Sequence, residues 1–158
     1  MIKEVNRSMT DITALAKSAI EKLDESDENQ LYQELGIRLK AIASDPALAG
    51  SFDPAVTYSA PLMGPLDDVK LFGKKFFEKM SREAYGLVCG GGLTAEEQKK
   101  FTEALGNKAD WGSWLAAILV AHWALAPAIA AVVAALVVRL FFKPAHAAMC
   151  EVWAGKLG

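Results

Sequence analysis

The feature that most constrains this chain is an apolar segment near its C-terminus. From Trp114 to Val138 the sequence runs for 25 residues without a formal charge, interrupted by His122 and, near its centre, by Pro127. A helix that is apolar on every side has no face suited to water, so it lies in the centre of a protein core or in a membrane. The length of the run also meets the requirement for crossing a bilayer.

Proline at position 127 divides this segment. Proline removes a backbone hydrogen bond from a helix interior but is favoured in a first turn, so we expect two helices, 112–126 and 128–142. Each is short for a bilayer span, so a hairpin or a kinked single span follows. The residues beside the break include Leu125 and Ala126, whereas turns in water favour Gly, Asn, Asp and Ser. The tip is therefore expected to be buried in protein or to enter lipid.

The rest of the chain predicts an all-α protein without a β-sheet. Apolar residues recur at helical spacing, and Thr94 with Glu97 forms a capping-box sequence at the start of one short helix. The expected helices are 10–24, 27–44, 67–88, 94–105, 112–126, 128–142 and 144–155.

We expect the helices to form a bundle, with the amphipathic N-terminal helices around or before the apolar pair. A length of 158 residues fits one domain. Within that domain, 1–158, we distinguish an amphipathic helical pair (1–45), a Pro-rich connection (46–66), a basic helix with a capped short helix (67–110), and the apolar pair with a final helix (111–158).

The helix expected at 67–88 combines basic and apolar residues. Its predicted inward stripe is Val69, Phe72, Phe76, Met80, Ala84 and Leu87. The candidate membrane-surface residues are Lys70, Lys74, Lys75 and Lys79, since lysines beside an aromatic stripe occur at anionic membrane surfaces. The alternative is an ordinary solvated basic face, diluted by Glu78 and Glu83.

Charge argues against nucleic-acid binding. The chain has a formal net charge of −2, and residues 111–158 contain a single acidic residue and three basic ones. Phosphate binding requires a dense basic surface, which neither residues 1–110 nor residues 111–158 offer. We expect no nucleic-acid partner.

Cysteine and histidine give little support for chemistry. Cys89 and Cys150 are far apart in sequence, which favours two buried thiols in a reducing compartment over a disulfide framework. His146 and Cys150 are four residues apart, so they share a helix face and could both reach Zn²⁺. His122 is expected to be a core histidine. We expect no catalytic residue, no metal site and no cofactor.

These observations lead to a hypothesis of a small non-enzymatic protein that associates with or inserts into a membrane, as an effector or pore-former would. Its general plan, an apolar helical pair inside amphipathic helices, resembles pore-forming colicin domains in architecture, without a shared motif. The candidate membrane-segment residues are Trp114, Leu115, Ile118, Leu119, His122, Trp123, Pro127, Ile129, Val132, Val133, Leu136 and Val137.

The alternative is a soluble all-α interaction or oligomerisation module whose apolar helices form the core. The partner would then be another protein, or a second copy, instead of lipid. The N-terminal sequence MIKEVNRSMTDI has no apolar stretch after its charges, so we expect synthesis in the cytoplasm. Under the first hypothesis the protein is membrane-associated in at least one state, and under the second it stays cytoplasmic.

Overall fold

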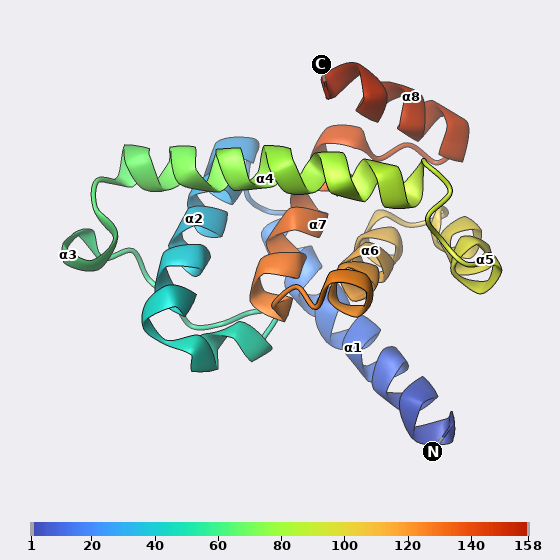
Figure 1. Ribbon diagram of the computed structural model, residues 1–158, viewed down its shortest axis with the longest axis horizontal. Helices are drawn as coiled ribbons and strands as arrows, with labels where there is room; N and C mark the ends of the chain where they lie inside the picture. The colour runs from blue at the N-terminus through green and yellow to red at the C-terminus, as the bar shows by residue number, and fades with distance from the viewer. Residues whose placement is uncertain (1, 158) are drawn as a thin grey trace.

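The computed structural model describes residues 2–157, with side chains described from residue 13 onward. Over this range the protein is all-α, as predicted, with eight α-helices and no strand (Figure 1). The elements are α1 (Ile2–Leu23), α2 (Glu28–Ser44), the 3₁₀ helix η1 (Pro46–Gly50), α3 (Ala60–Met63), α4 (Leu66–Val88), α5 (Ala95–Ala104), α6 (Lys108–Trp123), α7 (Pro127–Phe141) and α8 (His146–Lys156).

Local capping explains where several helices begin. Asp27 and Gln30 form a capping box at the start of α2, and Thr94 with Glu97 forms the predicted one at α5. Pro127 is in the first turn of α7, so the predicted break of the apolar segment is confirmed.

Other boundaries differ from the predictions. Helix α1 begins at Ile2 instead of residue 10, and the Pro-rich connection contains η1 and α3. Helix α6 starts at Lys108 instead of residue 112, because Asn107 caps it by accepting hydrogen bonds from the backbone amides of Ala109 and Asp110. Helix α8 starts at His146 instead of Pro144. Pro144 lies in a bend, and Ala145 has an extended backbone conformation.

Helix α7 is the central element of the bundle. It contacts α1, α2, α4, α6, α8 and η1, and it lies near the middle of the molecule in Figure 1. Twelve of its fifteen residues are buried. The apolar segment is thus the core of this fold, and amphipathic helices cover it.

Helices α2 and α4 cross at two glycines. A methyl group on Gly36 would overlap the backbone of Val69, and one on Gly73 would overlap the carbonyl oxygen of Tyr32. The two backbones therefore approach more closely than side chains would allow. This contact sets the orientation of α4, the long helix that crosses the upper half of Figure 1.

The predicted inward stripe of α4 is partly wrong because of this crossing. The inward row contains Gly73, Phe77 and Ser81, next to the correctly predicted Val69. Phe72, which was expected inside, is 43% exposed.

Helix α8 packs across the C-terminal part of α4 and the end of α7. The buried Trp153 donates a hydrogen bond from Nε1 to Oγ of Ser81 at 2.9 Å. Its ring stacks on Phe141, with ring centroids 5.2 Å apart. A disulfide between Cys89 and Cys150 also joins α8 to the end of α4.

Candidate functional site

The first candidate site is the hairpin formed by α6 and α7. The two helices pack against each other and are joined by Ala124, Leu125 and Ala126. Ala124 has a φ of +50°, the left-handed conformation that ends many helices. All three residues are apolar, although the turn reaches the surface, where Ala124 is exposed and the other two are half-buried. The hairpin therefore has an apolar tip at the surface.

The predicted membrane-segment residues fall into two groups. Those along the two helices are buried in the core, and those near the tip are at or near the surface. The buried group is Trp114, Leu115, Ile118, Leu119, Ile129, Val132, Val133, Leu136 and Val137. The group near the tip is His122, Trp123 and Pro127.

His122 is not a core histidine, contrary to the prediction. Its Nε2 lies 2.8 Å from a carboxylate oxygen of Glu97 on α5, at the surface. Burial acts to raise the pKa of the Glu97 carboxyl, but hydrogen bonds from the Thr94 backbone and from His122 outweigh it, so the net pKa is below the ordinary value. The pair connects the end of α6 to α5.

Arg38 holds the beginning of α7. Its side chain is 2% exposed, and Nη1 donates hydrogen bonds to the carbonyl oxygens of Phe52, at 2.8 Å, and Ala128, at 2.9 Å. Its Nε donates to Glu34 at 2.8 Å, and Asp53 lies 3.8 Å from Nη2. The burial of Arg38 was not predicted from the sequence. The spacing of Glu34 and Arg38 indicates a helical ion pair but not its burial.

A cavity of about 550 Å³ lies beside the hairpin tip. It is lined by residues of α1, of the connection after α2, and of the hairpin, including Leu15, Phe52, Val120 and Pro127. Leu15 is 64% exposed. Apolar surface is therefore accessible beside the tip.

The exposed face of α4 is the second candidate site. Lys74, Lys75 and Lys79 are exposed, as the membrane-surface prediction requires, and Lys70 is half-buried. Leu71 is 49% exposed on the same helix.

Additional apolar residues accompany this basic face. Phe72 is exposed on α4, and the Nζ of Lys40 lies 4.5 Å from the centre of its ring. Leu62 and Leu66, at the α3–α4 corner, are 70% and 36% exposed. Apolar periodicity predicted Phe72 in the core, so its exposure on this face was not foreseen.

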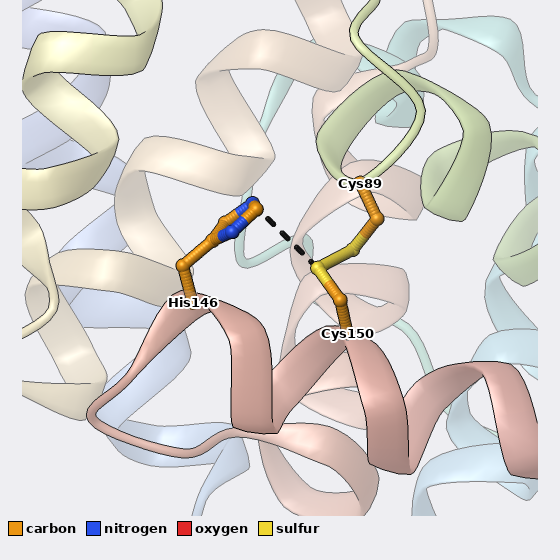
Figure 2. Close-up of side chains that lie close together, drawn as sticks. All are labelled: Cys89, His146 and Cys150. Carbon is orange, nitrogen blue, oxygen red and sulfur yellow. Dashed lines mark hydrogen bonds between the residues drawn. A yellow bond between two sulfur atoms is a disulfide. The ribbon is translucent and has the colours of Figure 1, made fainter.

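The third candidate site contains the chain's two cysteines. Figure 2 shows Cys89 bonded to Cys150, with the His146 ring pointing toward the bond. The expectation of two thiols is therefore wrong in this structure. Nε2 of His146 lies 3.6 Å from Sγ of Cys150, so the predicted shared helix face is confirmed. All three residues are half-buried.

Among the described residues, no single helix is both long enough and apolar enough to cross a bilayer. Helices α7 and α8 together reach the required length and hydropathy, with a bend of 99° between them.

The chain matches no protein-family model, and neither a curated protein nor a solved structure is significantly similar to it.

Proposed function

We propose that this small all-α protein is a non-enzymatic membrane-associated protein that stores the α6–α7 hairpin in its core and transfers it to lipid. Such a protein would act as an effector or pore-former. Its direct partner would be membrane lipid, and cytoplasmic synthesis stays a prediction.

The observation that carries this proposal is the surface position of the apolar hairpin tip. A hairpin that served only as core could end in a polar turn, since Ala124 is exposed to water. Instead Leu125 and Ala126 extend the charge-free segment through the turn. Lipid is about as apolar as a protein interior, so helices of this composition can exchange one environment for the other at low cost.

The exposed face of α4 supports a first contact with an anionic membrane. Each lysine near such a surface contributes roughly 1 kcal/mol of attraction. Exposed Leu71 and Phe72 would add burial of apolar side chains at the lipid interface. Binding through α4 would precede transfer of the hairpin.

A probe at the tip tests the transfer step. Because the two native cysteines are bonded to each other, Ala124→Cys introduces the one reactive thiol for an environment-sensitive fluorophore. With vesicles of phosphatidylcholine and phosphatidylglycerol, at neutral or acidic pH, we expect a blue shift of emission for the tip label. The same label at Ala147→Cys, an exposed position on α8, is the control and should shift less.

Charge reversal tests the binding step. Lys74→Glu with Lys75→Glu should weaken vesicle sedimentation while leaving the melting temperature nearly unchanged, because both side chains are exposed. Lys99→Glu with Lys100→Glu, on α5, makes the same charge change at another exposed surface and should retain more binding. Equal binding by the two double variants would reject the role of α4.

The complete burial of the middle of α7 favours a second candidate. The bundle already buries the apolar segment away from water, as expected for a soluble interaction or oligomerisation module. In that case the wild-type protein stays in the supernatant with vesicles at both pH values, and the tip label does not shift. That result would replace the membrane proposal with the soluble module.

A further inference from the structure

Three side chains of metal-ligand type come together where α4 ends and α8 begins. Cys89 directly follows α4, whereas His146 and Cys150 occupy successive turns of α8. The two Sγ atoms and a ring nitrogen of His146 all lie within 4.8 Å of one another. Figure 2 shows the three side chains converging from opposite sides.

The spacing of His146 and Cys150 fits a tetrahedral zinc ion. Zinc binds histidine nitrogen at about 2.0–2.1 Å and thiolate sulfur at about 2.3 Å, which places the two ligand atoms roughly 3.6 Å apart in a tetrahedron. Nε2 of His146 and Sγ of Cys150 are 3.6 Å apart. This pair therefore needs little rearrangement to bind the metal.

The second sulfur becomes a ligand only after the disulfide opens. Two thiolates on one zinc ion are separated by roughly 3.8 Å, which a covalent bond between the two sulfurs does not allow. The Cα atoms of Cys89 and Cys150 are 5.9 Å apart, so rotation of the two side chains can provide this separation.

We propose that Cys89, His146 and Cys150 form a redox-controlled zinc site. Two equivalents of a small thiol reduce the disulfide, giving two cysteine thiols and one small-molecule disulfide. Zn²⁺ then displaces the two thiol protons and binds both thiolates and the neutral imidazole. Water occupies the fourth position.

His146 has one contact that favours this role and one that zinc would replace. Its Nε2 is 3.4 Å from the carbonyl oxygen of Val88, and the ring packs edge-on against Phe101, with centroids 4.9 Å apart. The packing against Phe101 orients the ring toward the sulfurs. Zinc binding at Nε2 requires the imidazole proton to be on Nδ1, which gives up the contact with Val88.

The oxidised and zinc-bound states have one property in common, since each connects the end of α4 to α8. Reduction without metal removes that connection. The site would therefore keep α8 docked in both oxidising conditions and reducing, zinc-containing ones.

Cobalt titration tests the proposal. The full-length protein, reduced with a phosphine, should bind one equivalent of Co²⁺ with the visible bands of tetrahedral cobalt and a thiolate-to-cobalt charge-transfer band. Zn²⁺ should abolish these bands by displacement. The oxidised protein should show neither band.

Variants identify the ligands. Even a change to a residue that only supports a metal ligand weakens metal affinity by about 10–100-fold. Loss of a direct ligand should cost at least as much, so His146→Gln should weaken binding by roughly tenfold or more. His146→Cys supplies a different ligand and should therefore recover tight binding. If His146 had only a structural role, this substitution would not recover it. His122→Gln, at the chain's other histidine, is the control and should bind like wild type.

Two outcomes would overturn the zinc site. One is the absence of a thiolate-to-cobalt band in the reduced wild-type protein. The other is equal metal affinity for wild type and His146→Gln, with circular dichroism showing that both retain their helices.

Discussion

The guanidinium group of Arg38 donates a hydrogen bond to the carbonyl oxygen of Ala128 at 2.9 Å, although 90 residues separate them in sequence. The same nitrogen donates to Phe52 in the Pro-rich connection. One buried side chain thus joins α2, the connection and the first turn of α7.

Arg38→Met should therefore destabilise the protein. It leaves the buried carbonyl of Phe52 without its donor, at a cost of about 2–3 kcal/mol. Urea denaturation measures the loss. The control is Arg82→Met, an exposed position on α4, which should stay within about 0.5 kcal/mol of wild type. Equal stabilities of the two variants would contradict the role given to Arg38.

Replacing glycine by alanine should have opposite effects on stability at two positions of α4. Gly73→Ala places a methyl group against backbone atoms of Tyr32 and Gly36, and we expect a loss of about 2–3 kcal/mol. A methyl group on Gly86 meets no atom within 4 Å, so Gly86→Ala should stabilise α4 by up to about 1 kcal/mol. Thermal unfolding compares them, and a neutral Gly73→Ala would refute the close crossing.

The disulfide should make a large contribution to the free energy of unfolding. Cys89 and Cys150 are 61 positions apart, and closing a loop of that length is worth about 4 kcal/mol in the chain-entropy description. We expect Cys89→Ser with Cys150→Ser to lose most of this in urea denaturation. Added reductant should destabilise wild type but leave the double variant unchanged.

The Glu97–His122 pair predicts a dependence of stability on pH. Because the folded-state pKa of Glu97 lies below its ordinary value of 4.5, the carboxylate stabilises the protein above that pH. This contribution is lost as pH falls through the folded-state pKa. The melting temperatures of wild type and Glu97→Gln should therefore differ at neutral pH and converge in acid. Glu103→Gln, exposed on α5, is the control.

Local signals in the sequence were sufficient to predict every α-helix except α3, and the break at Pro127. Capping boxes, proline and apolar periodicity act within one or two turns, so they can be recognised without tertiary structure. The apolar tip was recognised for the same reason, since its residues are consecutive.

Such local signals could not identify which face of α4 is buried. Apolar periodicity favoured Phe72 as an inward residue, whereas the structure places Gly73 there. A glycine contributes nothing to a hydrophobic pattern, but opposite Gly36 it permits close backbone approach. The inward row was therefore determined by a partner helix.

Contacts between residues far apart in the sequence could not be predicted either. The disulfide of Cys89 with Cys150 requires the end of α4 to meet α8 across the fold, and sequence spacing does not encode that distance. Burial of Arg38 likewise depends on carbonyl groups far away in the chain.

The bond between Cys89 and Cys150 also closes a covalent ring that contains α5, α6 and α7. If the hairpin enters lipid as proposed while this ring is intact, its two ends stay connected to each other through the disulfide, so both ends emerge on the same side of the bilayer. A straight crossing would place them on opposite sides and drag the charged helix α5 or the end of α7 with its following segment through lipid. Under the membrane proposal, the oxidation state of two sulfur atoms thus restricts the topologies open to the chain.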